Sequence, residues 1–233
     1  MPGAPPPRSA PQMTIDADPA AIGSGRGNAA FVRIYRWGAA ALVLSAAVHT
    51  VTSGWDEPSF TLANFLSYFT VLSNLYAMVI LVATGAWAGE RLSHRCEMAR
   101  GAAVLYMAMT GLVYALLLSG VDVQTDQYTN WVMHRIVPVI VVLDWLYEPP
   151  REPIDLRSAV SWLAFPLLYL LYTLMRGPFV DWYPYPFVDP TRGGGYVRVA
   201  LNAIGVALGF VVVTWLVTWS ATWALSRRRP GPG

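Results

Sequence analysis

Six long apolar stretches limit what this chain can fold into more than any other feature of its sequence. In chain order they cover residues 34–52, 60–84, 99–119, 129–147, 158–175 and 196–225. Their lengths are close to the ~17–25 residues that an α-helix needs to cross a bilayer. Hydrocarbon offers the backbone no hydrogen bonds, so each stretch is expected to be helical, and the short alternating segments of a β-barrel are absent. The stretches predict an all-α, polytopic integral membrane protein with six transmembrane helices.

The composition supports this class. Hydrophobic residues make up 55% of the 233 residues and charged residues 13%, whereas a soluble domain carries about 25% charged residues. The net charge is only +2, and the basic residues are spread over loops, so we expect no nucleic-acid partner. A single cysteine, Cys96, excludes an internal disulfide. The sequence has no HExxH, P-loop, GxGxxG or GxSxG motif, and we expect no metal and no cofactor.

The arginines in the loops and at the ends of the apolar stretches predict the orientation. On one side of the predicted membrane they are Arg33, Arg36, Arg91, Arg95, Arg100, Arg151, Arg157, Arg227, Arg228 and Arg229. Short cytoplasmic loops are enriched in basic residues, so we expect both termini to be cytoplasmic. Residues 1–30 are rich in Pro, Ala and Gly, which is typical of a disordered tail. The expected organisation is this tail, a transmembrane domain over residues 31–225 and a basic cytoplasmic tail over residues 226–233.

Two of the stretches contain polar residues that a bilayer does not require. Thr70 lies in YFTVLSN, and His134 lies in TNWVMHRIVP. At ~1.5 Å of rise per residue, Thr70 is expected about 15 Å and His134 about 8 Å inward from the outer ends of their stretches. Thr70 shares a helix face with Ser73 and Asn74, and His134 shares one with Asn130. Polar groups at such depth indicate a functional site by default.

These residue types are the ones that acyl transfer requires. A hydroxyl can act as the nucleophile, an imidazole can take its proton, and amide or hydroxyl groups can donate to the oxyanion. Pro138 follows His134 by four residues, so the carbonyl of His134 loses its helical partner and a kink is expected. Two other interpretations stay open. Thr and Ser hydroxyls often bond back to their own helix, and Asn and His often hold membrane helices together without any chemistry.

The segment between the fifth and sixth stretches is the candidate lid. Its sequence, RGPFVDWYPYPFVDPTRGGGY, is rich in prolines and aromatic residues. Aromatic side chains are common at the membrane surface, and a stiff surface segment of this kind can exclude water from a site beneath it. The residues expected to form the lid or line the pocket are Tyr114, Tyr185, Pro186, Phe187 and Asp189.

Three motifs occur in order: the threonine of YFTVLSN, the histidine of NWVMHRIVP and the loop YPFVD. With them the chain resembles the androgen-induced family of six-span membrane hydrolases over roughly residues 31–225. Animal members of that family hydrolyse fatty acid esters of hydroxy fatty acids with a threonine and a histidine. The resemblance implies the same roles for Thr70 and His134.

The chain also departs from the animal proteins. They have histidines before the YPF loop, where this chain has Met175, Arg176 and Gly177. Its Pro-rich tail, Ala-rich stretches and WYPYPF segment are more similar to uncharacterised bacterial relatives, which implies a bacterial cell membrane. The fold and the catalytic pair are expected to carry over, and the substrate is not.

We therefore expect a membrane-embedded ester hydrolase acting on a lipid-like acyl ester, with Thr70 as nucleophile and His134 as base. Ser73, Asn74 and Asn130 are the expected oxyanion donors or orienting residues. The expected partners are membrane lipids and the ester substrate. The alternative is a non-enzymatic lipid- or sterol-binding membrane protein, or a small transporter, that uses the same pocket. Transporters commonly contain internal repeats, and none is visible in this sequence.

Overall fold

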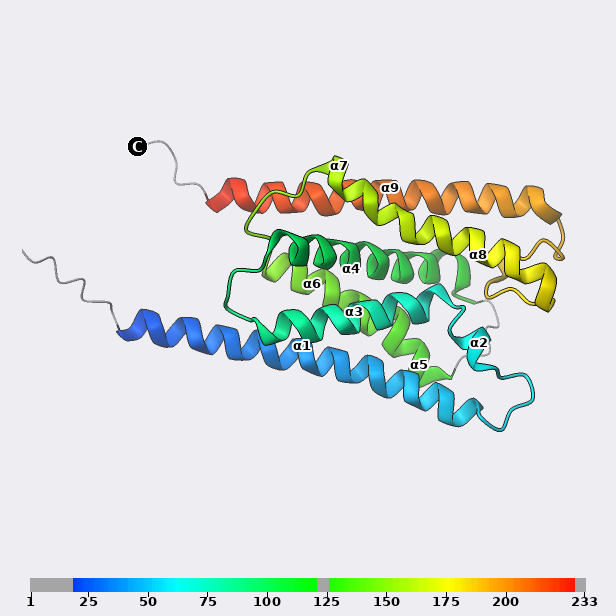
Figure 1. Cartoon of the computed structure of the whole chain (residues 1–233), viewed down its shortest axis with the longest axis horizontal. Coiled ribbons are helices and arrows are strands. Elements are labelled where there is room, and N and C mark those ends of the chain that lie inside the picture. Colours follow the sequence, from blue (N-terminus) through cyan, green and yellow to red (C-terminus); the bar gives the residue numbers. More distant parts are fainter. Residues whose placement is uncertain (1–18, 121–125, 229–233) are drawn as a thin grey trace, which may run out of the picture.

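The computed structural model describes the backbone of residues 19–120 and 126–228, which form a helical bundle without strands (Figure 1). Its α-helices are α1 (Pro19–Gly54), α2 (Leu62–Phe65), α3 (Phe69–Ala86), α4 (His94–Val113), α5 (Gln127–Trp131), α6 (Val137–Tyr147), α7 (Leu156–Ala159), α8 (Ala164–Val180) and α9 (Gly195–Arg228). Two π-helical turns, η1 (Tyr114–Leu118) and η2 (Val132–Ile136), and two 3-10 turns, η3 (Val160–Leu163) and η4 (Pro186–Val188), also lie within these residues. The start of α1 and the end of α9 are at the same end of the bundle, on the left of Figure 1.

Five helices are long and apolar enough to cross a membrane. They cover Asn28–Gly54, Phe69–Ala86, His94–Leu118, Leu156–Val180 and Gly195–Arg227. The remaining predicted stretch, residues 129–147, lies in a continuous helical run formed by α5, η2 and α6. This run is not among the five, because several polar and charged residues interrupt its apolar sequence. The all-helical class is thus confirmed for the described residues. The membrane-type character of five helices is confirmed by their length and composition.

α1 begins at Pro19, before the predicted boundary near residue 30, and its membrane-length part covers Asn28–Gly54. Proline fits the first turn of a helix, where its missing N–H is not needed. The residues that follow, AAIGSGRGN, combine two alanines, which favour a helix, with three glycines, each of which weakens it. Residues 1–18 of the expected tail lie outside the described part of the chain. At the other terminus α9 continues to Arg228, and residues 229–233 of the expected basic tail also lie outside it.

The second apolar stretch is not one helix. α2 ends at Phe65 and α3 begins at Phe69, so a break separates them. Ser67, which lies within the break, donates to the carbonyl of Ala63 at 2.6 Å, whereas Thr61 caps the start of α2 by accepting from the Asn64 N–H at 3.1 Å. The expectation of one continuous helix through Thr70 is therefore wrong. Hydropathy alone did not reveal the break.

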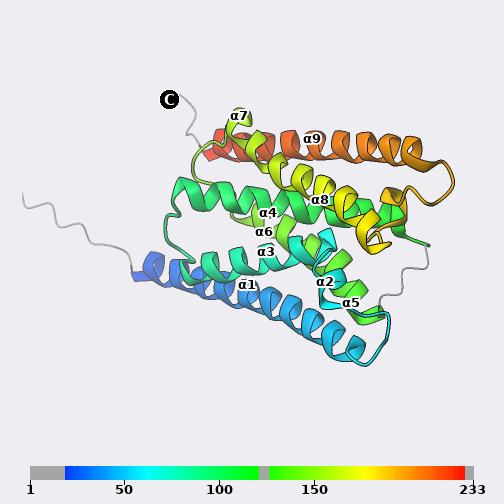
Figure 2. The ribbon, with the colours of Figure 1, turned by 45° about the vertical axis from the view of Figure 1, so that its right-hand side comes forward.

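α4 lies at the centre of the bundle. It packs against α3, α6 and α9, and in both views it lies between α3 and α9 (Figures 1 and 2). Small residues permit the close packing: a Cβ atom on Gly101 would lie 2.5 Å from the ring of Trp162. α8 and α9 are much less enclosed, since only 17% of the most apolar window of each is buried. These two helices therefore expose long apolar faces to the surroundings.

A buried network of charges joins α1, α4 and α6. The Asp144 carboxylate accepts from Arg36 Nε at 2.6 Å and from Arg100 Nη2 at 3.1 Å. Arg100 also pairs with Glu97 at 2.8 Å, and Arg36 pairs with Glu148 at 2.9 Å. Arg36 is 1% exposed and Asp144 is 7% exposed. Asp144 is therefore the centre of an interhelical ion network rather than a simple helix-end charge.

Candidate active site

Thr70 is the second residue of α3, at the N-terminal end of the helix. The first N–H groups of a helix have no partner within it, and the N–H of Thr70 donates instead to the hydroxyl of Tyr185 at 3.1 Å. The side chain of Thr70 is 6% exposed. The positive end of the helix dipole thus lies at this hydroxyl, where it favours negative charge.

His134 faces Thr70 across the bundle. Its Nε2 atom lies 3.2 Å from Thr70 Oγ1, within hydrogen-bond distance. His134 lies in the π-helical turn η2, which ends two residues before Pro138. The expected irregularity therefore occurs, but as a widened turn; such π-bulges are frequent at functional sites. The ring of Tyr114, which lies in the other π-helical turn, η1, stacks on the imidazole, with 4.5 Å between the ring centroids.

Tyr185 belongs to the candidate lid and makes direct contact with Thr70. Its hydroxyl lies 3.1 Å from Thr70 Oγ1, in addition to accepting the Thr70 N–H. Tyr185 is 6% exposed, and burial raises its pKa to about 12 although the hydrogen bonds with Thr70 act in the opposite direction. A Tyr185→Thr70→His134 chain of hydrogen bonds is possible, in which Tyr185 donates to Thr70 and Thr70 donates to Nε2. From the sequence we expected Tyr185 in the lid or the pocket lining, without this contact.

Ser73 and Asn74 lie beside Thr70, but their donors are already engaged. Ser73 donates to the carbonyl of Thr70 at 3.1 Å and contacts the hydroxyl of Thr110 at 2.9 Å. Asn74 Nδ2 donates to the carbonyls of Thr70 at 2.8 Å and Met133 at 3.0 Å. In this geometry neither residue is free to donate to an oxyanion. They connect the start of α3 to η2 and α4, and so act as orienting residues.

Asn130 lies one turn before His134. Its Nδ2 atom donates to the hydroxyl of Tyr114 at 2.9 Å, which holds the ring that stacks on the imidazole. Asn130 Oδ1 and His134 Nδ1 are both buried and have no hydrogen-bond partner among the described residues. An acceptor without a donor and a ring nitrogen without a partner thus lie on one helix face, four residues apart.

Two cavities meet at Thr70. One, the apolar cavity, has a volume of about 260 Å³ and lies between α3, α4, α8 and α9. The other, the polar cavity, has a volume of about 780 Å³ and is bounded by α1, α2, α3, η1, α5 and η2. Thr70, Leu118 and Tyr185 line both, whereas His134 and Asn130 line only the polar cavity.

The other predicted lid residues divide into two groups. Phe187 lines the apolar cavity and stacks on Tyr185 at 5.2 Å, and Tyr114 lines the polar cavity. Pro186 and Asp189 line neither cavity. Asp189 is therefore not a pocket residue.

Asp189 instead shapes the loop itself. It accepts from the N–H of Thr191 at 2.9 Å and lies 3.3 Å from Arg192 Nε. Partial burial acts to raise the pKa of Asp189, but the hydrogen bonds from Thr191 and the pairing with Arg192 hold it below its ordinary value.

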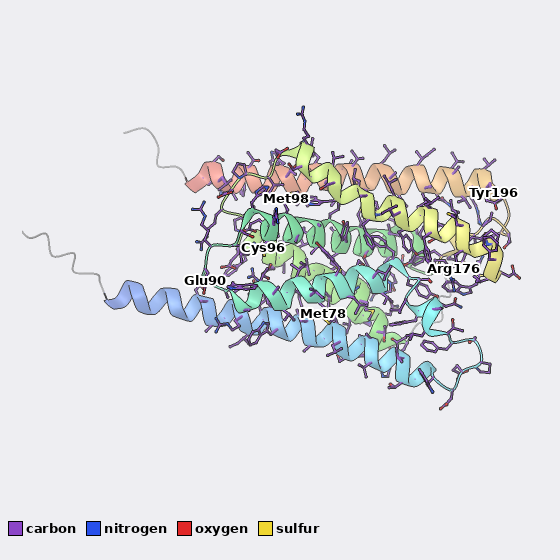
Figure 3. All side chains as sticks on the ribbon, viewed as in Figure 1. Met78, Glu90, Cys96, Met98, Arg176 and Tyr196 are labelled. Atoms are coloured by element: carbon purple, nitrogen blue, oxygen red, sulfur yellow. The ribbon has the colours of Figure 1, made fainter. Side chains whose placement is uncertain are left out.

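Two arginines anchor the loop that carries Tyr185. Arg198 of α9 donates to the carbonyls of Pro186 at 3.2 Å and Asp189 at 2.9 Å. Arg176, labelled near the end of α8 in Figure 3, donates to Asn64 Oδ1 at 2.7 Å. The loop is thus fixed to α9 on one side, and the end of α8 is fixed to α2 on the other.

Two further polar residues, His49 and Arg135, line neither cavity. His49 pairs with Asp126 at 3.1 Å. Arg135 lies over the ring of Trp131 at 4.2 Å rather than in an ion pair with Asp126. Among the described residues there is no group of three or more His, Cys, Asp or Glu side chains that could hold a metal ion.

Comparison with protein-family models, with curated proteins and with solved structures gives no match.

Proposed function

We propose that the chain is a membrane-embedded ester hydrolase that acts on a lipid-like acyl ester. The observation that carries this proposal is the 3.2 Å distance between Thr70 Oγ1 and His134 Nε2 at the boundary of the polar and apolar cavities. A nucleophile and a base within hydrogen-bond reach form the core of an acyl-transfer site. The cavities supply access for water on one side and for hydrocarbon on the other.

The reaction proceeds in two steps. His134 Nε2 takes the proton of Thr70 as Oγ1 attacks the ester carbonyl, and the same proton passes to the departing alcohol as its C–O bond breaks. Water then attacks the acyl-threonine, His134 takes the proton of that water, and Thr70 leaves with this proton as the free acid forms. Ester and water thus give acid and alcohol, and both side chains return to their initial state.

The first step needs His134 with a free lone pair on Nε2 and therefore a proton on Nδ1. Asn130 Oδ1 is a buried acceptor without a partner on the same helix face. A rotation of the Asn130 side chain that brings this oxygen to Nδ1–H would fix the required tautomer. Backbone carbonyls and carboxylates do the same for other catalytic histidines. We therefore assign Asn130 as the positioning residue of the base.

Negative charge on the tetrahedral intermediate has two stabilising groups nearby. The Tyr185 hydroxyl is a donor 3.1 Å from Thr70 Oγ1, and the N-terminal end of α3 places a positive partial charge at the same point. Preorganised donors of this kind commonly supply the largest share of catalysis in acyl transfer. Tyr185 replaces Ser73 and Asn74 as the proposed oxyanion donor.

We place the site in the outer half of a six-span topology with both termini cytoplasmic. The helical run of α5, η2 and α6 supplies the sixth crossing, which agrees with the position of the start of α1 and the end of α9 at one end of the bundle. Arg33, Arg91 and Arg227 belong to that end, as expected for a cytoplasmic face. The order of the motifs around Thr70, His134 and Tyr185 also supports kinship with the androgen-induced family, in a bacterial member located in the cell membrane.

Hydrolysis of a chromogenic long-chain ester by the purified protein in nanodiscs tests the proposal. Thr70→Ala and His134→Ala are each expected to remove nearly all activity, because the two residues act as a unit. Thr84→Ala is the matched control, since Thr84 is a buried threonine of the same helix whose hydroxyl bonds only to the carbonyl of Ile80. Full activity in both site variants, with melting temperatures equal to that of the control, would overturn the proposal.

A second candidate is a non-enzymatic protein that binds a lipid or sterol. The apolar cavity favours it, because a binding protein needs such a cavity and no chemistry. Under this interpretation Thr70→Ala would alter ligand affinity, and neither the wild type nor any variant would release acid from an ester.

A further inference from the structure

We propose that the apolar cavity is the binding site for the acyl chain of the ester, and that the chain enters it from the bilayer between α8 and α9. This inference rests on the proposed function, because it assigns the occupant of the cavity by the reaction at Thr70. The occupant is one hydrocarbon chain, with its ester carbonyl at Thr70.

The polar groups of the cavity wall favour hydrocarbon over a polar ligand. The hydroxyls that reach this wall already have partners: Tyr169 donates to the carbonyl of Ser67 at 2.9 Å, and Thr110 donates to the carbonyl of Tyr106 at 2.9 Å. The remaining lining is almost entirely aliphatic and aromatic. A polar group placed here would lose its hydration without gaining a hydrogen bond, whereas a methylene chain loses nothing.

The cavity opens toward the lipid rather than toward water. Leu167 of α8 and Val211 of α9 line it, yet they are 61% and 53% exposed. Both helices are long and apolar enough to lie in a bilayer, so an opening between them faces acyl chains of the membrane.

The two cavities divide the substrate at the scissile bond. Thr70 and Tyr185 line both, so an ester carbonyl at Thr70 has its acyl chain on the apolar side and its alcohol on the side of His134. The larger polar cavity then holds the alcohol part and the hydrolytic water. Its volume of about 780 Å³ is sufficient for a bulky alcohol, within the ~300–1,000 Å³ typical of ligand pockets.

Chain-length preference tests the acyl site. The protein in nanodiscs is given butanoate and dodecanoate esters of one chromogenic alcohol. The ratio of the two kcat/KM values is then compared between variants. Ala203 and Ala207 of α9 line the cavity, whereas Gly205 lies on the opposite helix face with open space around it. The Ala203→Leu/Ala207→Leu double variant is expected to lower the dodecanoate-to-butanoate ratio about tenfold or more, and Gly205→Leu is expected to leave it unchanged. An unchanged ratio in the double variant would overturn the acyl site.

A crosslinking measurement separates this inference from the proposed reaction. A fatty acid with a diazirine near its tail is irradiated with wild-type protein in nanodiscs, and the labelled peptides are identified. Labels are expected on α8 and α9, and fewer of them in the double variant than in Gly205→Leu. If fewer labels form in the double variant than in Gly205→Leu but no ester is hydrolysed, the acyl site stands and the hydrolase proposal falls. Labels confined to the polar cavity, or equal in both variants, would overturn the acyl site even in an active hydrolase.

Discussion

The hydroxyl of Tyr185 joins the outer loop to the start of α3. It accepts the N–H of Thr70 and lies 3.1 Å from its Oγ1, so it positions the proposed nucleophile. In the proposed reaction the same hydroxyl also stabilises the negative charge that develops on the substrate. Tyr185→Phe removes this donor and keeps the ring that stacks on Phe187. Loss of one oxyanion donor commonly costs about 10²–10³ in kcat. We expect a fall of that size in ester hydrolysis, and a small decrease in melting temperature because the buried Thr70 N–H loses its acceptor. A fall in activity of less than tenfold would remove Tyr185 from the mechanism.

The same residue gives a pH prediction. A tyrosine of ordinary pKa, about 10, would lose half of its protons at that pH, whereas burial raises the pKa of Tyr185 to about 12. A raised pKa favours the neutral phenol, so the donor persists into alkaline solution. The ratio of wild-type to Tyr185→Phe activity is therefore expected to stay constant between about pH 7 and about pH 10. A ratio that falls toward one near the upper limit would show that the phenol ionises earlier.

At the scale of elements, the loop before α9 is held in place by side chains of α9 that donate hydrogen bonds to its backbone carbonyls. Arg198 donates to the carbonyls of Pro186 and Asp189, and Asn202 donates to the carbonyl of Phe187 at 3.1 Å. The position of Tyr185 in this loop thus depends on α9. The π-helical turns η1 and η2 fix the opposite wall of the site, where the rings of Tyr114 and His134 stack.

Arg198→Ala is expected to loosen this loop. Its carbonyl partners would lose their donor, so amide hydrogen exchange in residues 182–190 should rise and ester hydrolysis should fall with Tyr185 less well positioned. Arg192→Ala is the control, because Arg192 is 57% exposed and pairs only with Asp189 of its own loop. Equal exchange and activity in the two variants would contradict the anchoring role of Arg198.

At the scale of the whole molecule, the bundle is held together by charge at one end and carries the candidate site at the other. Arg36 donates to the carbonyl of Thr84 at 3.3 Å, and Thr84 lies about 21 Å along α3 from Thr70 at ~1.5 Å per residue. Asp144, between Arg36 and Arg100, joins three helices far from the proposed chemistry.

Asp144→Asn is expected to destabilise the whole bundle. It leaves two buried guanidinium groups without their shared carboxylate, and breaking a buried ion pair in this way costs about 3–5 kcal/mol. Glu152→Gln is the control: the Arg91–Glu152 pair is exposed, and exposed pairs contribute only about 0–1 kcal/mol. Thermal unfolding in detergent should show a large decrease for the first variant and almost none for the second. The folded fraction of Asp144→Asn should keep its specific activity, because the network does not contact Thr70.

Several features could be predicted from the sequence because they depend on local chemistry. Apolar length gave the membrane-type helices, and polar residues within those stretches pointed to Thr70 and His134. The break before α3 could not be predicted, because Ser67 stabilises it through a local hydrogen bond to the Ala63 carbonyl that hydropathy does not record. The contact of Tyr185 with Thr70 joins residues 115 positions apart, so it depends on how the loop packs against α9.

The N-terminal part of α1 and the ion network around Asp144 also show what local sequence does not predict. The extension of α1 back to Pro19 was missed, because a composition rich in glycine and proline was interpreted as disorder. The place of Asp144 in the ion network could not be predicted either, since its two arginine partners come from other helices. Long-range pairing of this kind needs the packed bundle.

The most direct test of the central claim is to locate the adduct of a fluorophosphonate probe on the wild-type protein by peptide mass spectrometry. We predict one adduct, on Thr70, and none in His134→Ala, because the hydroxyl reacts only when the imidazole takes its proton. An adduct on Ser73 or on another hydroxyl, or no adduct on well-folded wild-type protein, would contradict the assignment of Thr70 as nucleophile.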